Sequence, residues 1–150
     1  MKKVFALLLA PLLMSACIRV NTEGEIAAES KAETDGAFIH ISKGSADTHD
    51  VLMALMLADK FSTSNDVLVF FDKEGIELVT KDAPNLEMEP FDNSDDIFER
   101  LINLNVTILA CPACMKVSGV EEADLREGVQ MAEKEQFFDF TEGRILTLDY

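Results

Sequence analysis

Positive charge is scarce in this chain of 150 residues. It has 13 lysines and arginines against 28 aspartates and glutamates, so its formal net charge is −15 at pH 7. An acidic surface repels phosphate backbones and anionic lipid headgroups. We therefore expect neither a nucleic-acid-binding protein nor one that lies flat on an anionic membrane.

Several catalytic and metal-binding patterns are also missing. The chain has two histidines, His40 and His49, which are not clustered with the cysteines in sequence. Zinc normally takes four such ligands, and only one pair of cysteines is closely spaced. There is no Ser/His/Asp arrangement, no dinucleotide-binding fingerprint and no internal repeat, and Lys43–Ser45 is too short for a phosphate-binding loop. We expect no cofactor, and we expect His40 to be a core histidine within a strand.

The first 16 residues have the composition of an export signal. Two lysines precede a short apolar run, Val4–Leu13, which is too short to cross a bilayer. Met14–Cys17 resembles a bacterial lipobox, because an ordinary cleavage site after Ala16 would need a small residue at Met14. The resemblance implies cleavage before Cys17, lipidation of its thiol and a periplasmic, lipid-anchored protein. The alternative is a cytosolic protein with an apolar tail.

Two regions follow the predicted signal peptide. Residues 17–36, after the lipidated cysteine, are rich in Glu, Ala, Ser, Thr and Asn and have little to bury, so we expect a flexible tether. Residues 37–150 are enough for one hydrophobic core and too few for two domains. The sequence therefore predicts one domain tied to a membrane only through its lipid.

Apolar runs and helical patterns alternate along residues 37–150. Strands are predicted at Ala37–Ile41, Val67–Phe71, Val106–Ala110, Val129–Ala132 and Arg144–Leu148, with a short extended piece at Ile76–Thr80. Helices are predicted over residues 47–61, 95–104 and 133–142. The alternation indicates an α/β fold of three layers, with a mainly parallel five-stranded sheet between helices.

Some local features are also predicted for the helices. We expect Ser94 to cap the helix over residues 95–104. The helix over residues 133–142 should end at Gly143, and its aromatic residues are candidates for burial: Phe137, Phe138 and Phe140.

The helix over residues 47–61 is apolar at every position from Val51 to Ala58. A helix of this kind is buried on more than one side. One side can cover the sheet, and the other, with Met53, Met56 and Leu57, needs a second cover. We expect that cover to be another subunit of an oligomer, since large exposed apolar patches are unusual on monomers. The alternative is another helix of the same chain.

Cys111 and Cys114 are the strongest candidates for chemistry. They follow a predicted strand, and Pro112 suits the first position of a helix. A helix start stabilises a thiolate, and reactive groups collect at the carboxyl ends of parallel strands. If the first strand neighbours the third, His49 comes close to the thiol. Lys116 is the nearest cation in sequence, so His49 and Lys116 are candidates for activating it.

Four segments resemble the DsrE/DsrF-like family in their order and spacing: Phe70–Val79, Cys111–Val120, Glu121–Val129 and Arg144–Leu148. The resemblance implies a flavodoxin-like parallel sheet, homo- or hetero-oligomers, and carriage of sulfur as a cysteine persulfide. By its spacing to Gly119, the carrier cysteine corresponds to Cys111. Cys114 corresponds to a second cysteine that only some members have. Ser118 stands where many relatives have arginine.

The two thiols leave several functions open. Our leading hypothesis is a sulfur carrier or sulfurtransferase whose partners are sulfur donors and acceptor thiols, either proteins or small sulfur compounds. The alternatives are dithiol–disulfide exchange, Cu(I) binding with help from Met115, and a structural cysteine pair in an oligomeric interaction module.

Overall fold

The computed structural model describes residues 33–150 of the chain. The predicted signal peptide, Cys17 and the tether up to residue 32 lie outside the described residues. Within residues 33–150, no helix has the length and apolar character that a membrane crossing requires.

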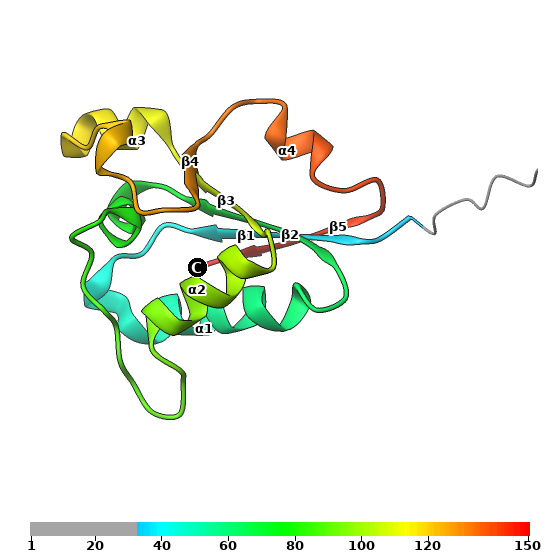
Figure 1. Cartoon of the computed structure of the whole chain (residues 1–150), viewed down its shortest axis with the longest axis horizontal. Coiled ribbons are helices and arrows are strands. Elements are labelled where there is room, and N and C mark those ends of the chain that lie inside the picture. Colours follow the sequence, from blue (N-terminus) through cyan, green and yellow to red (C-terminus); the bar gives the residue numbers. More distant parts are fainter. Residues whose placement is uncertain (1–32) are drawn as a thin grey trace, which may run out of the picture. The chain divides into compact units, whose positions relative to one another are not determined.

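Five parallel strands form the sheet, which confirms the predicted α/β fold. They are β1 (Gly36–Ile41), β2 (Asp66–Phe71), β3 (Thr107–Ala110), β4 (Val129–Met131) and β5 (Ile145–Asp149). Their order in the sheet is β4-β3-β2-β1-β5 (Figure 1). The chain therefore adds strands outward from β1 to β4 and then returns to the other side of β1, so the strand order reverses between β1 and β5.

The helices lie on both sides of this sheet (Figure 1). They are α1 (Thr48–Phe61), α2 (Ser94–Asn103), α3 (Pro112–Ser118) and α4 (Gln136–Asp139). Short 3₁₀ helices span Ser45–Asp47, Lys73–Val79 and Glu122–Asp124. α1 and α2 cover one face, α4 lies over the other, and α3 begins at the carboxyl edge directly after β3.

The hydrophobic core lies between the sheet and the pair α1 and α2. Side chains alternate along a strand, and Ile39, Ile41, Val69 and Phe71 point to this face and are wholly buried. The ring of Phe98 from α2 stacks on Phe71 at 5.8 Å between centroids. The last residue of β2 is therefore anchored in the core, which fixes where that strand ends.

The second side of α1 is covered in part by the same chain. α2 packs against α1, as the alternative interpretation expects. Met53, Met56 and Leu57 remain half-buried. A subunit interface at α1 stays a prediction.

The last helix is shorter than predicted. α4 has four residues within the predicted range 133–142, so Gly143 does not end it. Two of the three aromatic rings in the predicted range lie against the sheet, Phe137 on Phe38 and Phe70, and Phe140 beside Gly36 at the start of β1. Phe137 lies 6.0 Å from Phe38 and 5.1 Å from Phe70, whereas Phe138 is 69% exposed and Phe140 is half-buried.

The cap of α2 also differs from the prediction. The residue that caps it is Asn93, whose side chain accepts a hydrogen bond from the Asp96 N–H at 3.0 Å. Ser94 is instead buried as the first helical residue, and its hydroxyl accepts a hydrogen bond from the Leu86 N–H at 2.8 Å. The hydroxyl satisfies a loop donor rather than a helix donor.

The predicted extended piece at residues 76–80 is wrong, because Lys73–Val79 forms a 3₁₀ helix. Ile76 and Val79 point into the core from it and are wholly buried. The helix passes so close to the end of β1 that a Cβ at Gly75 would lie 2.5 Å from the Ile41 carbonyl oxygen. Glycine is therefore required at this crossing.

We expect Gly75→Ala to lower the free energy of unfolding by ~1–3 kcal/mol, the usual cost of overpacking, because the new methyl group meets backbone that cannot rotate away. Urea denaturation monitored by circular dichroism measures the change. Glu74→Ala, at an exposed position of the same helix, is the matched control. Equal stability of the two variants would contradict the close packing described here.

Candidate functional site

Cys111 is fixed to the sheet at the end of β3. Its N–H donates a hydrogen bond of 2.9 Å to the Phe71 carbonyl of β2. It is also the N-cap residue of α3, with Pro112 at the first helical position and Gly119 ending the helix at φ +70°. The backbone of the predicted reactive cysteine is therefore held from both sides, by a strand and by a helix.

Cys114 lies in the first turn of α3. Residues three apart in a helix share a face, so its thiol is next to that of Cys111. Both cysteines are free thiols, and both are half-buried against the core. The structure therefore presents a neighbouring dithiol that solvent reaches.

Asp72 lies beside Cys111 at the same edge of the sheet. Phe71 pairs with Ala110 in the β2–β3 register, so Asp72 and Cys111 are the next neighbours after the last pair. Alternation turns Asp72 away from the core, toward the face that carries His40. The Asp72 Oδ1 atom is 2.9 Å from His40 Nε2.

His40 lies between two carboxylates. Its Nδ1 atom is 2.7 Å from Asp149 Oδ1 at the end of β5, and its ring stacks on Phe70 at 5.6 Å between centroids. The side chains of His40 and Asp72 are 22% and 18% exposed. Nε2 and Oδ1 themselves are shielded from solvent and lack a well-directed hydrogen bond within the described residues. The two side chains are therefore in close contact at the carboxyl edge of the sheet.

Lys73 has an unusual backbone conformation, with φ at 45°. Residues other than glycine seldom occupy this left-handed region, and such strain is often found at functional sites. The backbone N–H of Lys73 hydrogen-bonds to the Cys114 sulfur. The strained residue thus turns a donor toward the second thiol.

The surroundings of Cys114 oppose its ionisation. The hydrogen bond from the Lys73 backbone lowers the pKa of the thiol, but it is outweighed by the other contributions. Burial, the hydrogen bond and charge of the Cys111 sulfur, and the negative charge of Asp72 together raise the pKa of Cys114 above its ordinary value. The folded structure therefore disfavours a thiolate on Cys114.

A hollow of about 400 Å³ opens beside Cys114. Its other lining residues are Lys73, Glu74, Val117 and Ser118. Val117 is 88% exposed, so an apolar side chain stands free at the mouth of the hollow. A small sulfur compound or a cysteine on a partner protein can reach Cys114 by this route.

The other predicted site residues lie elsewhere. The condition for His49 to approach the thiol is not met, because β2 separates β1 from β3. The exposed His49 ring lies against Phe91, at 5.5 Å between centroids. Lys116 is exposed in the last turn of α3, and it forms no ion pair in the described part of the chain.

Sequence reasoning missed the group formed by His40, Asp72 and Asp149. One available signal was the aspartate directly after the apolar run of β2, where polar residues at strand ends face the same edge as Cys111. The expectation of a core histidine at position 40 is also only partly right, because its ring is half-buried and touches two carboxylates.

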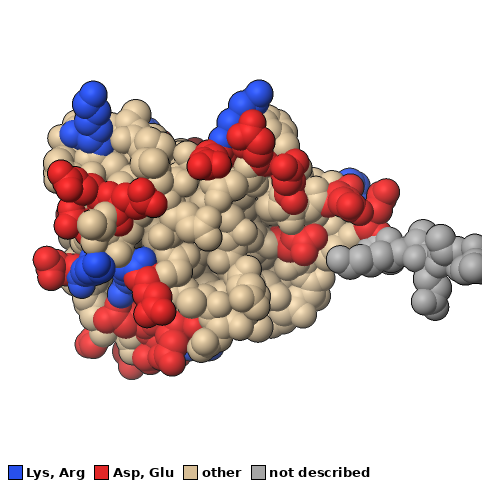
Figure 2. Space-filling model, turned by 45° about the horizontal axis from the view of Figure 1, so that its top comes forward, with Lys and Arg blue, Asp and Glu red and all other residues tan. Residues whose placement is uncertain are grey.

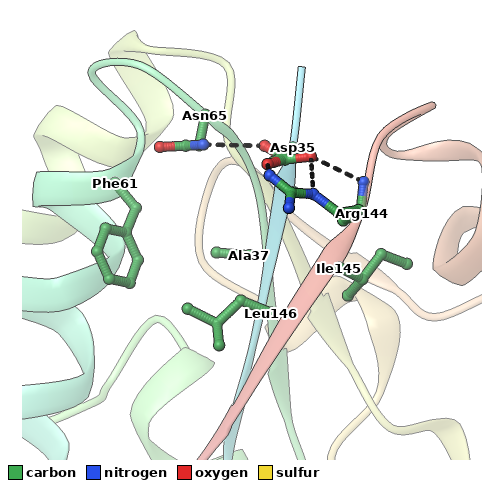
Figure 3. A pocket seen from close by; sticks show the side chains of 8 residues that line it. Asp35, Ala37, Phe61, Asn65, Arg144, Ile145 and Leu146 are labelled. Atoms are coloured by element: carbon green, nitrogen blue, oxygen red, sulfur yellow. Dashed lines mark hydrogen bonds and ion pairs between the residues drawn. The ribbon is translucent and has the colours of Figure 1, made fainter. Parts of the chain in front are cut away.

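A second hollow, of about 350 Å³, lies at the opposite, amino end of the strands (Figure 3). Phe61 and Leu146 form apolar walls, and Arg144 hydrogen-bonds to Asp35 beside them. The Arg144 guanidinium lowers the pKa of the Asp35 carboxyl group. The charged groups of this second hollow, Asp35 and Arg144, are thus paired with one another. The cysteine edge, which carries free thiols, is therefore the better candidate site.

Two further observations bear on possible ligands. Among residues 33–150, no three or more His, Cys, Asp or Glu side chains are grouped to hold a metal ion. Acidic side chains prevail on the face shown in Figure 2, around a broad area without charged groups. An acidic rim of this kind disfavours polyanionic ligands.

The chain belongs to the DsrE/DsrF-like family, whose sequence profile matches residues 36–144. This family is generally linked to sulfur relay. The match includes the candidate site up to the start of β5, with Cys111, Cys114 and Asp72.

Solved structures share the fold at low sequence identity. A protein of unknown function from Methanobacterium thermoautotrophicum, MTH1491, is 17% identical, with a TM-score of 0.58 over 77% of this chain and 100% of that one. The ychN protein of E. coli is 19% identical, with a TM-score of 0.54 over 77% of this chain and 99% of that one. No curated protein sequence matches the chain.

We expect alkylation of Cys114 to reach its half-maximal rate at a higher pH in the folded protein than in the same protein unfolded in guanidinium. The folded environment disfavours the thiolate, which is the form that reacts. Iodoacetamide pulses across pH, with peptide mass spectrometry to separate the two cysteines, measure both profiles. Coincident profiles would show that the environment of Cys114 has no such effect.

Proposed function

We propose that the protein is a sulfur carrier that holds sulfane sulfur as a persulfide on Cys111. The observation that carries the proposal is the half-buried free thiol at the end of β3, with a second thiol beside it and an open hollow, in a member of a family linked to sulfur relay. The position suits a group that must react with a partner and then be shielded between reactions.

Loading is a displacement at sulfur. The Cys111 thiolate attacks the outer sulfur of a polysulfide or of thiosulfate. A new S–S bond forms on Cys111, and the S–S bond of the donor breaks. The electron pair of that bond leaves with a polysulfide one sulfur shorter, or with sulfite, so no external oxidant or reductant is needed.

Delivery reverses the chemistry. An acceptor thiolate attacks the outer sulfur of the persulfide, and the Cys111 sulfur leaves as a thiolate. The acceptor becomes the persulfide, and the carrier returns to its starting state. Lys73 and Glu74 line the hollow with opposite charges, so the lining itself does not select the charge of a donor or acceptor.

Dithiol–disulfide exchange is the second candidate. It is favoured by the spacing of Cys111 and Cys114, which puts both free thiols on one face of α3. In this function the protein would alternate between a dithiol and a disulfide and would gain no sulfur. The two candidates therefore differ in the mass of the reacted protein.

We further propose that the protein works in the cell envelope, anchored through a lipid on Cys17. The support is the lipobox-like sequence Met14–Cys17 after a short apolar run. Sulfur donors and acceptors would then be met on the periplasmic side of a bacterial membrane.

The full-length chain with Cys17→Ser has Cys111 and Cys114 as its two thiols. We expect this protein, in mild detergent, to gain one or more sulfur atoms from polysulfide, and to lose them to an added acceptor thiol. Intact mass spectrometry without reductant measures both steps. The gain should be absent in Cys111→Ser and present in Cys114→Ser.

Two outcomes would contradict the carrier function. If Cys111→Ser accepts sulfur as well as the parent protein, Cys111 is not the carrier. If the parent protein instead loses two hydrogens and gains no sulfur, the reaction is disulfide formation, and the dithiol–disulfide function replaces the proposed one.

For the anchor, we expect the wild-type protein in a bacterial host to incorporate labelled palmitate and to sediment with membranes. Cys17→Ser should incorporate no label, because it lacks the thiol that takes the lipid. Cys114→Ser is the control and should be labelled like the wild type. Equal labelling of Cys17→Ser would rule the anchor out.

A further inference from the structure

The two thiols at the start of α3 are a set of metal ligands as well as a reactive pair. Cys111 and Cys114 are both free, and their sulfur atoms are joined by a hydrogen bond. A metal ion that takes the place of the shared proton would contact both sulfurs at once. Thiolates are soft ligands, which prefer soft ions such as Cu(I) to hard ions such as Mg²⁺ or Ca²⁺.

The number of ligands decides which soft ion this pair can hold. Within residues 33–150, no three or more His, Cys, Asp or Glu side chains are grouped to bind a metal. Zinc takes four protein ligands in structural sites and three in catalytic ones, so the described residues leave it incompletely coordinated. Cu(I) is suited to a pair of thiolates. The donor count therefore favours Cu(I) over zinc.

The neighbouring side chains that the structure describes add no further soft ligand. Met115 follows Cys114 directly in sequence, but its side chain is 3% exposed and packs in the hydrophobic core. The two ring nitrogens of His40 lie against the carboxylates of Asp72 and Asp149. Met115, which the sequence suggests as a helper, is therefore not in a position to bind the ion, and the ligands are the two cysteines.

The backbone around the pair suits a metal-bound thiolate. The Lys73 N–H donates a hydrogen bond to the Cys114 sulfur, and the unusual φ of 45° at Lys73 belongs to this turn. Donors of this kind orient a ligating atom from outside the coordination shell. The Cys111 backbone is fixed by its hydrogen bond to Phe71. Both ligands are therefore held by main-chain contacts before an ion arrives.

An ion can also reach the pair. The hollow of about 400 Å³ opens beside Cys114, and both cysteines are half-buried, so the sulfurs are accessible yet partly shielded from water. The chain carries a formal net charge of −15, which attracts cations to its surface. Access and charge thus both favour a cation at this edge of the sheet.

We propose that Cys111 and Cys114 form a binding site for Cu(I), held between their two thiolates. On binding, each S–H gives its proton to solvent and two Cu–S bonds form, while copper and sulfur keep their oxidation states. The inference goes beyond the carrier function and does not rest on it. The two uses exclude one another in time, because a Cys111 sulfur bound to copper cannot attack a sulfur donor.

The test uses the full-length Cys17→Ser protein, fully reduced and kept free of oxygen. It is titrated with Cu(I) against bathocuproine disulfonate, a coloured chelator that competes for the ion. We expect one copper per chain by native mass spectrometry. Cys111→Ser and Cys114→Ser should each lose more affinity than the ~10–100-fold that removal of an outer-shell partner costs, because each lacks a ligand.

Two controls test the choice of ligands and of ion. Met115→Leu replaces the buried thioether by a side chain of similar volume and should keep the affinity of the parent protein. An equal amount of Zn(II) should leave the bound copper in place. Because a serine variant that misfolds would also lose copper, circular dichroism checks each fold. Protection of both cysteines from iodoacetamide by Cu(I), measured in the parent by peptide mass spectrometry, needs no variant.

Several results would overturn the copper site. These are full affinity in either serine variant, a loss in Met115→Leu as large as that in Cys114→Ser, displacement of copper by zinc, or one copper per two chains. The outcomes also separate this inference from the proposed function. A protein that binds Cu(I) but never gains sulfur from polysulfide keeps the copper site and loses the carrier function. A protein that gains sulfur but yields all copper to the chelator does the reverse.

Discussion

The hydrogen bond from the Cys111 N–H to the Phe71 carbonyl is the contact on which the site depends. It extends the β2–β3 pairing by one step beyond the last residues of the two strands. Because Phe71 is buried under Phe98, the position of that step is set by the core. The positions of the Cys111 and Asp72 backbones are therefore set by packing on the face of the sheet that α1 and α2 cover.

Two thiols in contact cannot both ionise at the same cost. A thiolate on one raises the free energy of a thiolate on the other, so the pair titrates as a unit. Which thiol ionises first is decided by smaller asymmetries around them. At Cys114, the hydrogen bond from the Lys73 backbone lowers the pKa of the thiol, and it is outweighed by burial, by the neighbouring Cys111 sulfur and by the charge of Asp72.

The sequence alone predicted the five strands and the neighbouring cysteines at the end of one of them, because apolar periodicity and the spacing of Cys111 and Cys114 are local signals. It did not predict the strand order, which is set by pairing between distant segments, and the proposed approach of His49 failed for that reason. His40, which contacts Asp72, and Asp149, which contacts His40, were missed for the same reason. They are 109 residues apart in sequence and meet because β5 returns to pair with β1. The length of α4 was also overpredicted, since the structure is helical over Gln136–Asp139 within the predicted range 133–142.

The topology also explains why the site is spread over several strands. In open parallel sheets, ligands gather where the strand order reverses, which in this fold lies between β1 and β5. His40 and Asp149 occupy that point, whereas Cys111 follows β3, two strands away from β1. β2 lies between them, and Asp72 at its end touches the histidine on one side and neighbours the cysteine on the other. Asp72 is therefore the described residue that neighbours both the reversal point and the cysteines.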